Sequence, residues 1–278
     1  MRDWTALVGA LVVAGALIVT GGAAVSQADA PGAAYEDVVC IAHRGNSHQA
    51  PENTLVAYRE ASEAGADLAE CDVDISADDV VVLMHDRTVD RTTDGEGEVQ
   101  SLTVDELKEL DAGSWKSEDY AGEPVPTLSE LLAQHADDDM QIVIEIKAAG
   151  IAEQVVEIVR EHDAADGCVA FSFDRPTINA AASLHPGMPC FWLTSQVPED
   201  DAEMRAMVNG AVADGLAGLS VNVGTVRPEW VRYAHSRGLS VWVWTVNTPA
   251  AWETVCAAGV DGVITDRPGA FLEWQGRG

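Results

Sequence analysis

Positively charged residues are scarce in this chain. Its 278 residues contain 16 Lys and Arg against 46 Asp and Glu, which gives a formal net charge of -30 at pH 7. A surface this negative repels the phosphate backbone of nucleic acids and the head groups of anionic membranes, so neither is expected as a partner. Hydrophobic residues make up 47% of the chain, which excludes a disordered acidic tail and favours a folded body with an acidic surface. The acidity fits either salt adaptation or the codon usage of a GC-rich genome.

Cysteine pairs and lysines are also few. The five cysteines are an odd number without a C-x-x-C pair, so neither a zinc site nor a complete disulfide framework is indicated. Cys168 and Cys190 begin apolar runs in consecutive strand-like units, which allows either a disulfide between them or two buried free thiols. Lys108, Lys116 and Lys147 are the only lysines, so the position of each calls for a reason.

The N-terminus contains a long run without charge. Arg2 precedes an apolar stretch from Trp4 to about Val25, and small residues around Ala28 and Ala30 follow it. This order predicts that residues 1–30 are a secretory signal peptide with a short linker, and that the mature protein is secreted without stable membrane association. An uncleaved membrane anchor is the alternative, because the run approaches the ~20 residues needed to span a bilayer.

The rest of the chain, residues 31–278, alternates β-branched runs with amphipathic segments. Nine runs have the character of strands: 38–43, 67–75, 80–85, 141–147, 168–173, 189–194, 218–222, 239–246 and 259–265. Helical patterns fill most intervals: 53–65, 127–136, 150–162, 174–184, 200–213, 227–237 and 248–258. Strand and helix alternating at this spacing indicate a parallel sheet.

Nine runs are one too many for an eight-stranded barrel, but the second and third are too close together for a crossover helix. They are expected to form a hairpin that turns at Asp78 and Asp79. The remaining eight runs then predict a (β/α)8 barrel, a TIM barrel, with a small polar insertion at about 87–126 after the hairpin. A doubly wound sheet is disfavoured, because no Gly-rich turn follows the first strand.

Charged residues occur where several of these strands end. Glu70 and Asp72 project to one side of their strand, and Glu145 and Lys147 share a face in the same way. A two-residue hairpin turn places His85 opposite Asp72. Because active sites of such barrels lie at the C-terminal ends of the strands, these side chains are expected to meet there.

The predicted cluster has the groups that phosphoryl transfer requires. Three carboxylates in one barrel mouth repel one another unless a cation lies between them, and hard oxygen ligands select Ca²⁺ or Mg²⁺. His43 and His85 suit proton exchange near neutral pH, while Arg44 and Lys147 add positive charge for phosphate oxygens. Taken singly, each motif would more often be a surface pair or a turn, and it is their joint occurrence at strand ends that favours function.

Several ordered motifs then resemble the glycerophosphodiester phosphodiesterase family over about 38–270. They are His43-Arg44-Gly45, Pro51-Glu52-Asn53-Thr54, Glu70-x-Asp72, His85-Asp86 with Arg91-Thr92-Thr93, Glu145-x-Lys147, Trp244-Thr245-Val246-Asn247 and Thr265-Asp266-Arg267-Pro268. The resemblance implies a metal-dependent TIM-barrel enzyme that cleaves glycerophosphodiesters to sn-glycerol 3-phosphate and an alcohol.

The same resemblance implies a role for each matching residue. His43 and His85 become the acid/base pair, Glu70, Asp72 and Glu145 the metal ligands, and Arg44 and Lys147 the phosphate contacts. Glu52 is expected near the site, and Asn53 is expected to cap the following helix. Trp244 either lines the substrate pocket or packs in the core.

Two other functions remain open at this point. One is a phospholipase acting on intact lipid, like the sphingomyelinase D and phosphatidylinositol phospholipase C relatives of this barrel, although the polar insertion offers such an enzyme little apolar surface. The other is a catalytically silent binding barrel, which would lack a histidine or carboxylate of the motifs. None of these is missing here.

Overall fold

A computed structural model describes residues 30–278 of the chain. The predicted signal peptide therefore lies outside the described residues, apart from its last residue. Between residues 30 and 278, no helix is both long and apolar enough to cross a membrane.

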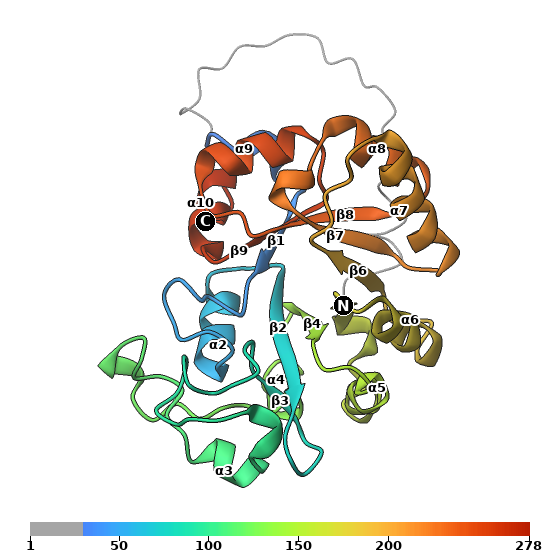
Figure 1. Cartoon of the computed structure of the whole chain (residues 1–278). Helices are drawn as coiled ribbons and strands as arrows, with labels where there is room; N and C mark the ends of the chain where they lie inside the picture. Colours follow the sequence, from blue (N-terminus) through green and yellow to red (C-terminus); the bar gives the residue numbers. More distant parts are fainter. Residues whose placement is uncertain (1–29) are drawn as a thin grey trace.

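Eight parallel strands form a closed barrel (Figure 1). They are β1 (Val39–Ala42), β2 (Leu68–Ile75), β4 (Gln141–Ile146), β5 (Cys168–Ser172), β6 (Cys190–Thr194), β7 (Gly218–Asn222), β8 (Ser240–Trp244) and β9 (Gly262–Thr265). The strand β1 pairs in parallel with both β9 and β2, which closes the sheet on itself. The predicted (β/α)8 architecture is therefore confirmed.

Helices surround the barrel in Figure 1 and cover the outer face of the strands. They are α2 (Leu55–Glu63), α4 (Leu128–Gln134), α5 (Ala152–Glu161), α6 (Arg175–Leu184), α7 (Asp201–Ala213), α8 (Pro228–Ser236), α9 (Pro249–Ala257) and α10 (Pro268–Gln275). Short 3₁₀ turns lie at η2 (Ala33–Tyr35), η5 (Ala165–Gly167) and η6 (Val223–Thr225). Most of these helices begin at a side chain that accepts a backbone N–H of the first turn, such as Asp174 before α6.

Large side chains fill the inside of the barrel. The ring of Phe191 stacks on that of Trp242 at 4.0 Å between centroids. Two glycines make this stack possible, because a Cβ at Gly218 would lie 2.3 Å from the Phe191 ring and one at Gly262 would lie 2.7 Å from Trp242. The inside of the barrel is therefore a packed core, and ligands are expected to bind at its rim.

The hairpin of β2 with β3 (Val81–Leu83) has a register that differs from the prediction by one residue. Val73 pairs with Leu83, and the backbone N–H of Met84 donates to the Asp72 carbonyl, so His85 does not lie opposite Asp72. The turn has three residues rather than two, because Asp79 adopts a left-handed conformation with φ 64°. The hydroxyl of Ser76 supports this turn by accepting the Val80 N–H at 2.9 Å.

The segment 87–126 folds beside β3 and has a small apolar cluster of its own. It contains η3 (Val99–Ser101), α3 (Val104–Lys108) and η4 (Glu118–Tyr120). The cluster joins residues of β3 and its end to residues of the segment: Val82, Met84, Val89, Val99, Leu107, Ala112 and Val125. The Lys116 ammonium donates to the carbonyl of Ser47 at 2.7 Å, which ties this segment to the loop after β1.

The cysteines and one histidine lie in the packed interior. All five cysteines are buried free thiols, and Cys190 pairs across the sheet with Ala170 rather than with Cys168, so the alternative without a disulfide is the correct one. His135 is buried as well, with its Nδ1 at 2.9 Å from Asp138 and its ring edge-on to Tyr58.

Candidate active site

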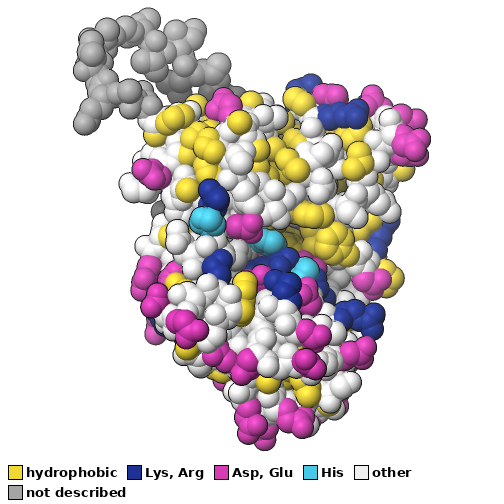
Figure 2. All heavy atoms as spheres, turned by 60° about the vertical axis from the view of Figure 1, so that its left-hand side comes forward, with side chains coloured by type: hydrophobic (Ala, Val, Ile, Leu, Met, Phe, Trp, Pro, Cys, Tyr) yellow, Lys and Arg dark blue, Asp and Glu magenta, His cyan; other side chains and the backbone are white. Residues whose placement is uncertain are grey.

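The residues proposed from sequence are brought together at the C-terminal end of the barrel. Figure 2 shows His, Lys and Arg side chains beside Asp and Glu at a hollow of the surface, with hydrophobic side chains along one border. The charged residues come from the ends of β1, β2, β3 and β4 and from the loops that follow them. They are His43, Arg44, Glu52, Glu70, Asp72, His85, Glu145 and Lys147.

Three buried carboxylates form the centre of the site. Oxygens of Glu70, Asp72 and Glu145 lie within 4.8 Å of one another, and the residues are 1%, 1% and 8% exposed. The strands explain this proximity, because Asp72 pairs directly with Glu145 across β2 and β4. Burial and the neighbouring carboxylates raise the pKa of Glu70 well above its usual value and that of Glu145 to about 7.

This cluster fits a divalent cation. Oxygen Oε1 of Glu70 is buried and has no hydrogen-bond partner among the described residues, as expected of an atom that is available to a metal. Carboxylate oxygens are the donors that Ca²⁺ and Mg²⁺ prefer. The three residues present therefore suit the ion class that the sequence predicted.

Arg44 offsets part of the negative charge of the carboxylate cluster. Its backbone N–H donates to Glu70 at 2.9 Å, and its guanidinium lies 3.2 Å from Asp72 and 2.7 Å from Glu52. Arg44 itself has φ 57°. The next residue must be glycine, because Gly45 has φ 78° and a Cβ there would lie 2.7 Å from the backbone of Ala57.

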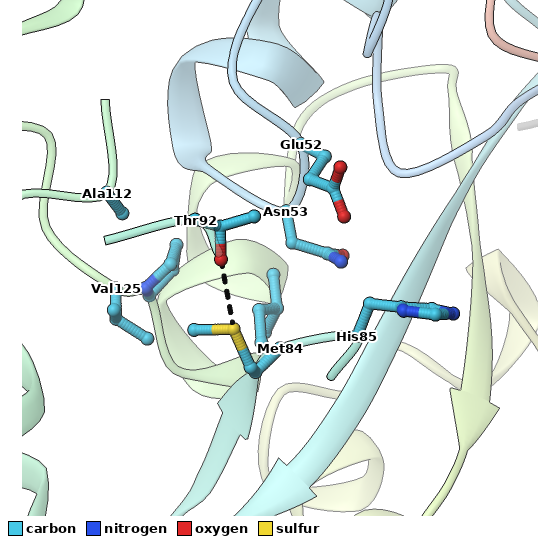
Figure 3. A pocket seen from close by; sticks show the side chains of 9 residues that line it. Glu52, Asn53, Met84, His85, Thr92, Ala112 and Val125 are labelled. Carbon is cyan, nitrogen blue, oxygen red and sulfur yellow. Dashed lines mark hydrogen bonds between the residues drawn. The ribbon is translucent and has the colours of Figure 1, made fainter. Parts of the chain in front are cut away.

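Asn53 positions Asp72 instead of capping a helix. Its amide N–H donates to Asp72 Oδ2 at 2.9 Å, and its Oδ1 accepts the Asp72 N–H at 3.1 Å and the Tyr58 hydroxyl at 2.8 Å. Thr54 is the residue that caps α2, so the predicted role of Asn53 was wrong by one position. Figure 3 shows Asn53 and Glu52 beside His85, at a small pocket whose other side is lined by Met84, Thr92 and Val125.

Each histidine is fixed through its Nδ1 by a carboxylate. Nδ1 of His43 lies 2.6 Å from Asp266 Oδ1, and Nδ1 of His85 lies 2.6 Å from Asp86 Oδ1. Asp266 also accepts hydrogen bonds from Ser47 and Asn247. Burial would raise the pKa of Asp266, but the hydrogen bond and the charge of His43 hold it below its usual value.

The Asp86 carboxylate is held by Arg91. The Arg91 guanidinium donates to Asp86 at 2.5 Å and, with its two terminal nitrogens, to Glu52 at 2.9 and 2.7 Å. The hydrogen bond from Arg91, with that of His85, lowers the pKa of Asp86 to about 2, so Asp86 stays ionised as the partner of His85. Asp86, Arg91, Asn247 and Asp266 all belong to the sequence motifs, yet their roles were not predicted.

Lys147 and Trp244 complete the set of predicted residues. The Lys147 ammonium lies 3.1 Å from Glu145 Oε1 and 3.3 Å from Asp72 Oδ1. Trp244 is half-buried at the end of β8, and its ring meets that of Phe173 edge-on at 5.5 Å between centroids. Trp244 therefore lies at the rim, above the Phe191–Trp242 stack rather than inside it.

Comparison with known proteins agrees with the motifs. The profile of the Glycerophosphoryl diester phosphodiesterase family matches residues 43–270. The chain belongs to this family. It is therefore an enzyme, a phosphoric diester hydrolase, as its motifs predicted.

Relatives and solved structures cover nearly the whole described chain. A glycerophosphodiester phosphodiesterase of Caldanaerobacter subterraneus is 35% identical over 243 residues, which are 86% of this chain and 98% of that protein. One of Bacillus subtilis is 29% identical over 255 residues, covering 84% and 85% of the two chains. The structure of an Oleispira antarctica phosphodiesterase in complex with the product sn-glycerol-3-phosphate has a TM-score of 0.79 at 31% identity, covering 87% of this chain and 98% of that one.

Proposed function

We propose that this enzyme hydrolyses glycerophosphodiesters to sn-glycerol 3-phosphate and an alcohol with the help of a divalent cation and two histidines. The observation that carries the proposal is the pair of imidazoles, each oriented by its own carboxylate. They lie at the same barrel end as three buried carboxylates and the basic side chains of Arg44 and Lys147. The product bound by the Oleispira antarctica relative supports the substrate class.

The histidines supply the proton transfers. Because Asp266 and Asp86 engage the Nδ1 atoms, Nε2 is the atom of each ring that is left to meet the substrate. A neutral imidazole takes the proton of the glycerol 2-hydroxyl as its oxygen bonds to phosphorus, and the other, protonated, gives a proton to the departing alcohol oxygen. Water then opens the cyclic phosphate that results, with the two proton roles reversed.

Glu70, Asp72 and Glu145 would hold the cation, which we propose is Ca²⁺ or Mg²⁺. Such an ion, when bound, neutralises charge that develops on phosphate oxygens and favours ionisation of a hydroxyl. Asn53 fixes one oxygen of Asp72, and Arg44 fixes one of Glu70. The guanidinium of Arg44 and the ammonium of Lys147 add charge for the phosphate of the substrate.

Chelation is expected to abolish the release of glycerol 3-phosphate, and added Ca²⁺ or Mg²⁺ to restore it. The same ion should raise the melting temperature of the wild type, because a ligand bound only to the folded state stabilises that state. The thermal shift should disappear in Glu70→Gln and persist in Glu157→Gln, whose side chain is exposed on α5. Full activity in chelator, or no shift with either ion, would contradict the shared metal site.

Asp266→Asn is expected to lower kcat by ~10²-fold or more, because a correctly oriented imidazole depends on its carboxylate partner. The Asp266 oxygens accept from both His43 and Asn247, whereas an amide has a single oxygen for these two donors. The variant should fold normally and keep its metal-induced thermal shift. Asp137→Asn, at an exposed position, is the control, and equal kcat values for the two variants would refute the role of Asp266.

We also propose that the mature enzyme is secreted. Support comes from the composition of residues 1–30 alone. N-terminal sequencing of the protein recovered from culture medium should begin at Asp29 or Pro31, that is, after Ala28 or Ala30. Recovery of the intact N-terminus in the membrane fraction would favour the anchor instead.

A further inference from the structure

A buried tyrosine hydroxyl is linked to the carboxylate cluster through a single residue. Tyr58 lies in the first turn of α2, beside β2 (Figure 1), and none of its surface is exposed. Its ring belongs to the apolar cluster between the helices and the barrel, but its hydroxyl donates to Asn53 Oδ1 at 2.8 Å. Asn53 in turn bonds Asp72, so Tyr58 is two hydrogen bonds away from a residue of the proposed cation site.

The hydrogen bonds of Asn53 fix which way its amide faces. Oδ1 accepts the backbone N–H of Asp72 at 3.1 Å, and because that group can only donate, the oxygen must lie at this end. The amide nitrogen is then directed at Asp72 Oδ2, 2.9 Å away. Burial and the neighbouring acidic groups raise the pKa of Tyr58 well above its usual value, so its hydroxyl keeps its proton and gives Oδ1 a second donor.

This chain of hydrogen bonds differs from the other contacts of Asp72. The guanidinium of Arg44 and the ammonium of Lys147 lie 3.2 Å and 3.3 Å from Asp72, and their side chains are 16% and 21% exposed. Both are also proposed to bind the phosphate of the substrate, which competes with Asp72 for their charge. The bonds through Asn53 and Tyr58 are buried and neutral, so they hold Asp72 whether or not substrate is bound.

We infer that Tyr58 is a positioning residue for the cation: through Asn53 it holds Asp72 in one orientation, so that its loss weakens Mg²⁺ binding more than Ca²⁺ binding. The inference rests on the metal site of the proposed function. Mg²⁺ demands a nearly ideal octahedral arrangement of ligands, whereas Ca²⁺ accepts flexible geometries. A carboxylate that is free to turn therefore costs more affinity for Mg²⁺ than for Ca²⁺. Residues that orient metal ligands commonly change metal affinity by about 10- to 100-fold.

The test is calorimetric titration of the metal-free enzyme with Mg²⁺ and with Ca²⁺. Tyr58→Phe removes only the hydroxyl and keeps the ring in the core. We expect it to raise the dissociation constant of Mg²⁺ by ~10-fold or more and that of Ca²⁺ by clearly less, so that the ratio of the two constants rises. Tyr120→Phe is the matched control, because its hydroxyl donates at 2.9 Å to Glu60, a residue of the same helix α2 outside the site. It should leave both dissociation constants unchanged.

A second variant tests whether Tyr58 acts through Asn53. Asn53→Gly removes the intervening amide, and glycine tolerates the φ of 58° at this position. In the Asn53→Gly background, Tyr58→Phe should change neither dissociation constant further, because the chain of hydrogen bonds is already interrupted.

Three outcomes would overturn the inference while the wild type still binds metal. The first is a lower melting temperature of Tyr58→Phe in chelator with unchanged dissociation constants, which would leave the hydroxyl a role in stability only. The others are an equal loss of affinity for Mg²⁺ and Ca²⁺, and the same change of their ratio in Tyr120→Phe. Failure of the wild type to bind either ion would instead contradict the metal site of the proposed function itself.

Discussion

Replacing His43 or His85 by Ala is expected to lower kcat/KM by ~10²- to 10⁴-fold, because each imidazole carries one of the two proton transfers. The variants should fold normally, since the side chains of His43 and His85 are 21% and 33% exposed and neither belongs to the apolar core. The thermal shift with metal should also persist, because neither ring is among the proposed ligands. His162→Ala is the matched control, because the ring of His162 bonds the exposed Ser129 and lies outside the proposed site.

A substrate with a better leaving group distinguishes the histidine that acts as general acid from the one that acts as general base. An alcohol of low pKa departs without a proton, so a glycerophosphodiester with a nitrophenol leaving group should restore activity to the variant that lacks the general acid. The variant that lacks the base should stay impaired with the same substrate. Near-native activity of either Ala variant towards glycerophosphocholine would refute the assignment of that histidine.

The sequence predicts the barrel well because each strand carries its own signal. The eight parallel strands are short apolar runs separated by helical patterns, and both features are local. The hairpin register was missed because it depends on the backbone conformation of one residue. The positive φ of Asp79 lengthens the turn, and nothing in the residue type requires that conformation, because Asp adopts it only occasionally.

The candidate site is predictable to the extent that it follows from strand geometry. Glu70 with Asp72, and Glu145 with Lys147, can be placed together because alternate residues share a face. The carboxylate that orients His43 could not be found in this way. It belongs to Asp266, which is 223 positions distant and reaches His43 only when β9 closes the barrel on β1. The position of Asp266 directly after the last strand was the one feature of the sequence that indicated a role at the barrel mouth.

For Asn53, the sequence predicted a local role where the structure shows a tertiary one. A helix follows it, so a cap was the local expectation, but its side chain serves a distant carboxylate instead. A left-handed backbone with φ 58° turns Asn53 away from the helix and leaves Thr54 to form the cap. Local rules fail here because a tertiary hydrogen bond to a buried carboxylate outweighs capping.

Lys147 is the basic residue whose position bears most directly on the proposed chemistry. Burial would lower the pKa of its ammonium, but the charges of Asp72 and Glu145 raise it above its usual value, so the group stays charged. The other lysines serve structure: Lys108 pairs with Glu130, and Lys116 bonds the loop after β1. A lysine paired with two carboxylates is consistent with a structural role too, and kinetics can separate the roles.

Lys147→Met is expected to lower kcat/KM by ~10²-fold or more at saturating metal, because a fixed positive charge beside the phosphate is worth several kcal/mol in the transition state. Lys147→Arg should recover only part, since a planar guanidinium cannot replace a point charge at the same place. Metal affinity should not fall in Lys147→Met, because the carboxylates Asp72 and Glu145 lose a competing cation. Calorimetric titration of Ca²⁺ and Mg²⁺ checks this, with Lys108→Met as the control. If metal affinity or melting temperature falls while kcat/KM at saturating metal is unchanged, then Lys147 orders the ligand carboxylates and does not serve the phosphate.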